Sequence, residues 1–250
     1  MPNEFVSVIN PTTEKGTGNE GSGRSYPILP VRDTVLFPHA VLPLTVGRES
    51  SIQLIQSLGE EKTILVVAQR DARQDAPLGS DLHMIGTRAT VHKVVKMPNQ
   101  SLFVFTEGTE RVKLGNFTQT QPFLTAEFET LEEMAPEASP EMEALQRNVL
   151  GQFQEIVTSS STLSDDLQTI ALNIEDPSRL SDFIAASLPF LTTTEKQELL
   201  ETPDVRVRLE KLNSHLAKEI EVQQLRNKIQ SEVQDSVQQS QRDFYLREQM

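Results

Sequence analysis

The residues best suited to chemistry are scattered and lack the local framework that chemistry requires. Gly16, Gly18 and Gly21 have the spacing of a dinucleotide-binding loop, but a polar segment precedes them and Arg24–Pro27 follows them. A working loop of this kind needs a strand before it and a helix N-terminus after it, so that backbone amides point at a pyrophosphate. We therefore expect no nucleotide site in this part of the chain.

The titratable residues also lack a catalytic arrangement. The chain has no cysteine, no GxxxxGK[ST] loop and no HExxH motif, and its four histidines are scattered: His39, His83, His92 and His215. The acidic pairs Glu132-Glu133 and Asp165-Asp166 lie in polar segments, without the apolar surroundings that raise a carboxyl pKa. We expect no catalytic residue, bound cofactor or metal ion in this chain.

Two apolar clusters are the candidate contact sites for a substrate or partner. Phe103 and Phe105 lie on one face of an expected strand and Leu102 and Val104 on the other. One face belongs in the core, and the other is either covered by a nearby helix or exposed as a patch that grips extended chains. The simpler interpretation buries both faces.

The second cluster lies at the far end of the chain, where an otherwise polar helix carries Phe244, Tyr245, Leu246 and Met250. These side chains could form a subunit contact or meet unfolded polypeptide. The simpler interpretation is helix packing within a larger intact protein.

The charge is unevenly distributed along the 250 residues. Residues 1–130 hold 12 basic and 14 acidic residues, whereas residues 131–250 hold 11 and 22, and the whole chain has a net charge of −13. An acidic half repels phosphate backbones, so we expect no nucleic-acid partner. Because no stretch approaches about 20 apolar residues, we expect no membrane span. The missing cysteines and the lack of a secretory signal at Met1–Asn10 favour a cytoplasmic location.

The first half of the sequence predicts a β-rich subdomain over residues 26–131, after a flexible tail of residues 1–25. Its expected strands cover Tyr26–Arg32, Val41–Val46, Thr63–Gln69, Met84–Met97, Leu102–Thr106, Thr109–Leu114 and Pro122–Thr130, with one helix at Arg48–Gly59. A turn is expected at Glu107-Gly108, and Arg111 and Lys113 are expected to point outward. Short strands joined by turns, with one inserted helix, predict a small antiparallel barrel or folded sheet.

The second half predicts only helices. A bundle of short helices is expected over residues 138–202, with starts at Ser139, Asp176 and Thr192. Residues 203–250 then predict one helix about 70 Å long, because no Pro or Gly occurs after Asp204. Its early apolar stripe can pack on the bundle, whereas its later stripe, from Val222 to Val237, needs another subunit or domain. The pattern is unfinished at Met250, so we expect a longer protein.

Several motifs resemble one known family, the N-terminal region of Lon, the ATP-dependent protease. They are PILPVRDTVLFPHAVLPLTVGR (27–48), LVVAQRD (65–71), IGTRATV (85–91), EGTERV (107–112), DPSRLSDFIAASLP (176–189), EKQELLETPDVRVRLEKL (195–212) and QRDFYLREQM (241–250). Together they cover both halves of residues 26–250, and only the first 25 residues or so have no counterpart.

The resemblance implies an α+β fold: a small antiparallel PUA-like β-barrel with one inserted helix, then a helical bundle ending in a long helix. It also implies recognition of unfolded or damaged proteins and assembly as a hexamer. The AAA+ ATPase, with its ATP and Mg²⁺, and the Ser-Lys peptidase would belong to downstream domains that this chain does not contain.

Two other classes of function stay open from the residues alone. One is a free-standing PUA-like module that binds a ligand or RNA, which would need a basic groove with aromatic stacking residues. The other is a coiled-coil scaffold that dimerises through residues 205–244.

Overall fold

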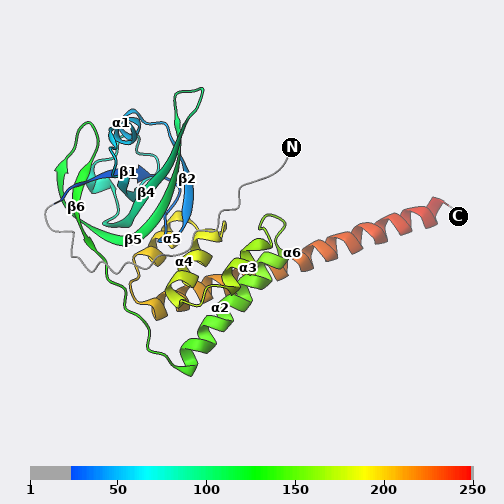
Figure 1. Cartoon of the computed structure of the whole chain (residues 1–250). Coiled ribbons are helices and arrows are strands. Elements are labelled where there is room, and N and C mark those ends of the chain that lie inside the picture. Colours follow the sequence, from blue (N-terminus) through cyan, green and yellow to red (C-terminus); the bar gives the residue numbers. More distant parts are fainter. Residues whose placement is uncertain (1–23, 249–250) are drawn as a thin grey trace, which may run out of the picture.

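A computed structural model of the chain describes residues 24–248, with side chains placed as far as residue 234. Figure 1 shows a curved β-sheet beside a cluster of helices, from which one long helix projects far beyond the rest of the molecule. The architecture is α+β, with a six-stranded sheet preceding most of the helices.

The sheet half contains β1 (Tyr26–Val31), β2 (Val41–Val46), β3 (Thr63–Ala68), β4 (Ile85–Lys96), β5 (Leu102–Gln119) and β6 (Thr125–Thr130). Helix α1 (Glu49–Ser57) lies between β2 and β3, and a 3-10 turn, η1, covers Gly79–Asp81. The strand order is β2-β5-β4-β3-β1-β6, and β6 also pairs with β5. Each expected strand range overlaps a strand of the sheet, although Leu102–Thr106 and Thr109–Leu114 both belong to β5, and the inserted helix is present.

The expected closed antiparallel barrel is not confirmed. The strands form one six-stranded sheet, and β1 pairs with β3 in parallel, with Ile28 opposite Leu65. The connection through β2 and α1 carries the chain across before β3, so that β3 can run in the same direction as β1. Strand β2 ends the sheet order and has only β5 as a neighbour.

Strand β5 is continuous where a turn was expected at Glu107-Gly108, so that expectation was wrong. Gly108 is needed here for a close backbone approach: a Cβ at this position would lie 2.2 Å from the Phe37 carbonyl oxygen. The Gly108 amide donates to the Ala40 carbonyl over 3.0 Å, and the His39 amide donates to the Gly108 carbonyl over 2.8 Å. The glycine thus lets the segment before β2 cross β5 instead of ending the strand.

The helical half contains α2 (Pro140–Ser159), α3 (Asp166–Leu172), α4 (Pro177–Ser187), α5 (Thr193–Leu200) and α6 (Val205–Glu248). The predicted helix starts are confirmed by their caps. The Ser139 side chain accepts from the Met142 amide, and Asp176 accepts from the amides of the first turn of α4. Thr192 and Glu195 form a reciprocal capping box. Each cap satisfies amides that have no partner inside the helix.

The core is divided between two hydrophobic clusters, and β3 contributes to both. Leu65 and Val67 belong to a cluster inside the curved sheet, whereas Ile64 and Val66 belong to a larger cluster that also contains buried residues of the helical half. Strand β3 is therefore buried on both faces, as its β-branched sequence predicts.

Candidate functional site

The outward face of β2, β5 and β4 carries a row of exposed apolar side chains. Phe103 and Phe105 are half-buried on this face, and their rings meet edge to face with centroids 5.2 Å apart. Opposite them in register lie Thr45 and Pro43 on β2 and Val95 and Lys93 on β4, and residues directly opposite one another share a face. We call the apolar members of this face the outer strip: Val41, Pro43, Val95, Phe103 and Phe105.

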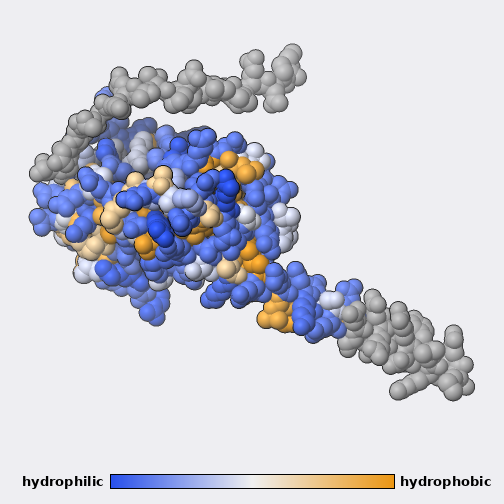
Figure 2. Space-filling model, turned by 90° about the horizontal axis from the view of Figure 1, so that it is seen from below, coloured by the Kyte–Doolittle hydropathy of each residue, from blue (hydrophilic) through white to orange (hydrophobic). Residues whose placement is uncertain are grey.

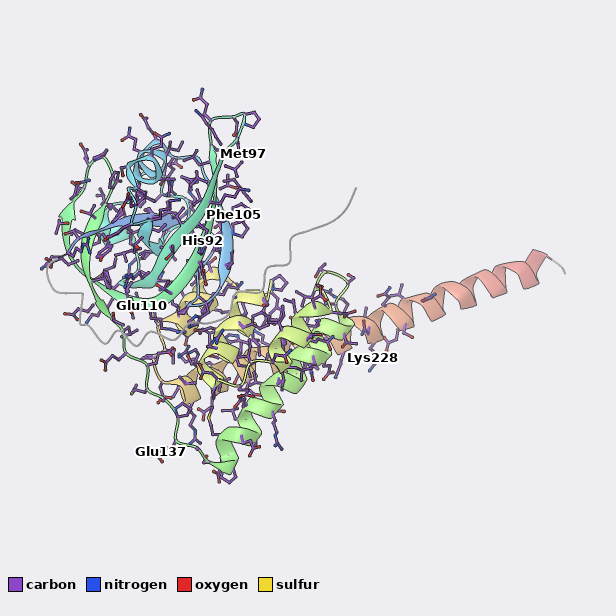
Figure 3. All side chains as sticks on the ribbon, viewed as in Figure 1. His92, Met97, Phe105, Glu110, Glu137 and Lys228 are labelled. Carbon is purple, nitrogen blue, oxygen red and sulfur yellow. The ribbon has the colours of Figure 1, made fainter. Side chains whose placement is uncertain are left out.

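The strip extends toward the free end of the β4–β5 hairpin. Met97, labelled in Figure 3 at the tip of that hairpin, is 41% exposed, and Val41 at the other end of the strip is 61% exposed. The opposite face of β5 is closed, because Leu102 and Val104 are buried in the core. The sheet thus holds the outer strip rigidly from behind, and α1 does not cover it.

One end of the outer strip is bordered by charge. His92 lies at an irregularity in the β4–β5 pairing, and its Nε2 is 2.6 Å from a carboxylate oxygen of Glu107. A bulge of this kind turns a side chain out of the regular alternation. The apolar surface therefore has a polar border, as expected of a contact site for another chain.

A second exposed apolar surface lies on α6, which we call the α6 stripe: Val222, Leu225, Ile229 and Val233. Their exposed fractions are 45–58%. They are three or four residues apart, like the buried residues before them, but the step of six from Leu216 to Val222 places them on another face of the helix. Figure 2 shows this hydrophobic surface on the projecting part of α6, just before the residues drawn in grey. Lys228, labelled in Figure 3, lies within this part of the helix, where it has left the bundle. Among the residues that the structure describes, nothing covers the stripe.

A buried group of charges joins the sheet to the helices. Arg111 of β5 and Arg208 of α6 both bind Asp182 of α4, and Arg208 Nη1 lies 2.7 Å from an Asp182 carboxylate oxygen. Both guanidinium groups also lie 2.6 Å from the Glu133 carboxylate, in the segment between the two halves. We call these four residues the charge cluster. Burial opposes ionisation of Glu133, but the hydrogen bond from Ser178 and the charges of Arg111 and Arg208 outweigh it and hold the pKa of Glu133 below its ordinary value.

The charge cluster corrects one expectation and supplies residues that the sequence did not reveal. Arg111 is on the face opposite Val112, as alternation predicts, but that face is covered by α4 and α6 and the side chain is only 2% exposed. One signal for the cluster was available in the sequence: Asp182 lies among the apolar residues of the buried stripe of α4, and a buried acid needs a positively charged or hydrogen-bonding partner.

The described part of the chain contains no arrangement typical of a metal site. Three of its histidines each pair with a single carboxylate: His83 with Glu201 at 3.0 Å, His92 with Glu107 at 2.6 Å and His215 with Glu195 at 3.6 Å. Residues 24–234 hold no group of three or more His, Cys, Asp or Glu side chains arranged to bind a metal ion. None of the described helices combines the length and the apolar character needed to cross a lipid bilayer.

The family model described as "ATP-dependent protease La (LON) substrate-binding domain" matches residues 25–218. The chain belongs to this family. The matched range contains the whole sheet, the charge cluster, the outer strip and the buried part of α6, and it ends just before the α6 stripe.

Relatives of the chain are themselves Lon proteases. The Lon protease of Koribacter versatilis is 65% identical over all 250 residues, which correspond to 31% of that relative. The Lon protease of Dictyoglomus thermophilum is 38% identical over 90% of this chain and 28% of its own length. The chain therefore spans about a third of the length of these relatives and corresponds to the Lon substrate-binding domain rather than to a complete protease.

Two solved structures share the fold. The N-terminal domain of the Mycobacterium avium complex Lon protease has a TM-score of 0.62 at 23% identity, covering 78% of this chain and 98% of that one. The Lon N-terminal domain protein from Xanthomonas campestris has a TM-score of 0.55 at 20% identity, covering 76% and 98%. At these identities the likeness concerns the fold alone.

Of the six residues that the sequence suggested as substrate or partner contacts, only two have side chains that the structure of this Lon domain describes. Phe103 and Phe105 lie together on the outer strip. Phe244, Tyr245 and Leu246 lie on α6 beyond the side chains that the structure describes, and Met250 lies outside the described residues altogether. Whether any of them contacts a substrate stays a prediction.

Proposed function

We propose that this chain is the substrate-recognition and assembly region of a Lon-type ATP-dependent protease. It binds unfolded or damaged proteins and hands them to an AAA+ ATPase and a Ser-Lys peptidase in the rest of the protein. The observation that carries the proposal is the outer strip, where exposed and half-buried apolar side chains line a sheet face whose other side is closed. Folded proteins bury such side chains, whereas unfolded chains expose them and can pair with the strip.

Each contact of this kind is weak, and weak contacts suit a recognition step that must release its substrate. Burying one aromatic side chain of the strip would contribute about 1–2 kcal/mol. In a hexamer, six copies near one pore would raise the effective concentration of binding sites, so that a long unfolded chain is retained without any tight contact. ATP and Mg²⁺ would act only in the ATPase domain, and we place the protein in the cytoplasm, bound to neither nucleic acid nor membrane.

The α6 stripe supports the assembly part of the proposal. Four exposed apolar residues at helical spacing are typical of a surface that packs on another helix. We assign this surface to a neighbouring subunit or to the following domain of the full-length protein. Analytical ultracentrifugation of the chain, with and without residues 222–250, would separate this role from a scaffold that dimerises on its own.

The outer strip is tested by titrating a labelled unfolded protein, such as reduced and carbamidomethylated lysozyme, into the isolated chain. The double variant Phe103→Ser/Phe105→Ser should weaken binding by about 30-fold or more, because two apolar contacts of about 1–2 kcal/mol each are lost. The matched control is Ile170→Ser/Leu172→Ser on α3, which removes two residues that are 46% and 58% exposed but lie far from the strip along the fold. Equal losses in both double variants would contradict the proposal, and so would ATP hydrolysis above background by the isolated chain.

A further inference from the structure

A groove lies between β1 and β2, on the open side of the sheet. Its volume is about 630 Å³, within the range of ligand-binding pockets. One wall is the consecutive stretch from Leu29 to Thr34 and the other is Pro43 to Arg48, with Ser51 of α1. We call this space the edge groove.

Both walls of the edge groove include a strand edge without a neighbour: β1 pairs with β6 only at Tyr26 and Pro27, and β2 pairs only with β5. The Ile28 amide bonds toward β6 and the Val31 carbonyl accepts from β3, so by alternation the Pro30 carbonyl points away from β3. Just before β2 the Ala40 carbonyl accepts from Gly108 of β5, so by alternation the backbone groups of Pro43 and Thr45 point away from β5. Apart from the strand ladders, no backbone hydrogen bond of the described residues uses Pro30, Pro43 or Thr45.

The two prolines limit what can pair there. Pro30 and Pro43 have no amide hydrogen, so the edges offer carbonyl acceptors and the amide of Thr45 but no long ladder. Such an edge resists indiscriminate strand pairing, and it leaves room for one short extended segment. A short backbone contact gives little selectivity, so a ligand that is retained here needs an additional anchor.

The anchor is supplied by two arginines at the end of the edge groove. Arg48 donates to the side-chain oxygen of Gln69 and to the Gln74 carbonyl, and no carboxylate of a described residue lies within 4.0 Å of it. Arg32 pairs with Asp75 at 2.7 Å, but the Asp75 side chain is 90% exposed. Burial and the neighbouring charge of Arg32 lower the pKa of the Arg48 guanidinium, and the charge of Asp75 only partly opposes them. Asp33 also lines the groove, and the charge of Asp75 reaches Arg48. Arg48 is nevertheless a lining guanidinium whose hydrogen bonds go only to neutral oxygens, so it can accept a carboxylate from a bound chain.

The N-terminus of α1 adds partial positive charge at the same end of the edge groove. Arg48 is the N-cap residue of this nine-residue helix, and no side chain caps its first amides. Free amides at a helix N-terminus carry partial positive charge and favour an anion. The apolar walls, the short strand edges and the positive end together match an extended peptide that carries a negative group.

We propose that the edge groove binds an extended peptide segment whose carboxylate sits between Arg48 and Arg32. This inference rests on the proposed function, because it names a second contact for the same unfolded substrates. The inference adds a chemical preference to the proposed function: the groove binds segments with a carboxylate beside small apolar residues more tightly than it binds neutral segments. The carboxylate belongs either to an Asp or Glu side chain or to the C-terminus of the substrate.

The test uses fluorescein-labelled hexapeptides of alternating valine and threonine, titrated into the whole chain and followed by fluorescence anisotropy. One peptide has a free C-terminal carboxylate, one a C-terminal amide, and one a C-terminal amide with a single internal aspartate. Binding of a carboxylate-bearing peptide should be at least about tenfold tighter than that of the neutral amide, and it should weaken with salt. The two carboxylate peptides show which source of the group fits.

Variants then locate the site. Arg48→Gln should remove the preference for the carboxylate, Arg48→Lys should keep part of it, and the control Arg147→Gln should change nothing, since Arg147 lies exposed on α2 beside Glu143. Thermal unfolding of each variant checks that it folds. In the unaltered chain, bound peptide should shift the amide resonances of Thr45 and Gly47. Equal affinity for the neutral and carboxylate peptides, or shifts confined to the outer strip, would overturn the proposal.

Failure of this proposal is distinguishable from failure of the proposed function. If no peptide binds the edge groove but unfolded lysozyme still binds and depends on Phe103 and Phe105, only the groove is excluded. If unfolded lysozyme does not bind either, both proposals fall.

Discussion

Helix α6 has two regions with the same pattern and opposite surroundings. In the first region Val205, Leu209, Leu212 and Leu216 are at most 1% exposed, whereas in the second the α6 stripe is 45–58% exposed. Within each region the apolar residues are three or four positions apart, and a step of six from Leu216 to Val222 turns the second set to another face of the helix. Amphipathic spacing therefore predicts that one face of a helix packs against another surface. It does not predict whether that surface belongs to the same chain, because this depends on the rest of the fold.

The largest expected effect concerns the charge cluster, which holds the first region of α6 against the sheet. Asp182→Asn would leave Arg111 and Arg208 buried beside a neutral amide. Removing one partner of a buried ion pair costs about 3–5 kcal/mol of unfolding free energy. Urea denaturation should show this loss.

The control for that measurement is Asp165→Asn, since Asp165 is exposed at the start of α3 and caps no amide. Its unfolding free energy should stay within about 0.5 kcal/mol of the unaltered chain. If Asp182→Asn is no more damaging than this control, the charge cluster does not stabilise the contact between the two halves.

A slightly smaller effect is expected from the apolar contacts of the same region. Leu212→Ala creates a cavity at a side chain that is fully buried and should cost about 2–4 kcal/mol. Leu225→Ala, one turn into the α6 stripe, should cost less than about 0.5 kcal/mol. Comparing Leu212→Ala with Leu225→Ala therefore measures how differently the two regions of α6 are packed. Similar losses of unfolding free energy at both sites would mean that the α6 stripe is covered in solution.

The pH dependence of the charge cluster sharpens the comparison further. Because the pKa of Glu133 is depressed in the folded chain, its contribution is present above the pKa of an unfolded glutamate, about 4.3, and is lost as the pH falls through the lower folded pKa. The difference in denaturation midpoint between the unaltered chain and Glu133→Gln should therefore shrink below about pH 4. A difference that is constant from pH 7 to pH 3 would contradict this assignment.

Local signals predicted much of this fold, and non-local contacts account for what was missed. Ser139 and the pair Thr192 and Glu195 predicted helix starts because a cap acts on amides only two or three residues away. The burial of the Arg111 side chain could not be predicted from local sequence. Its strand alternation was predicted correctly, but the helix that covers it is formed about seventy residues later and meets it through Asp182.

The same reasoning applies to the candidate surfaces. Phe103 and Phe105 could be placed on one face from their spacing, but their exposure depends on α1 packing elsewhere. The edge groove had no sequence signal, because it is formed by β1 and β2 failing to pair with each other. Parallel pairing of β1 with β3 determines that gap, and no local pattern encodes it.

The smallest expected change in stability is also the most informative about assembly. Leu225→Ser/Ile229→Ser removes two residues that are 58% and 52% exposed, so the unfolding free energy of a monomer should change by less than about 0.5 kcal/mol. In the full-length protein the same change should weaken subunit association, because these side chains would lose a partner helix. Sedimentation velocity over a range of concentrations measures that difference directly. A variant that is as stable and as fully assembled as the unaltered protein would show that the second region of α6 is simply a solvent-exposed spacer, and the contrast between the two regions would then carry no functional meaning.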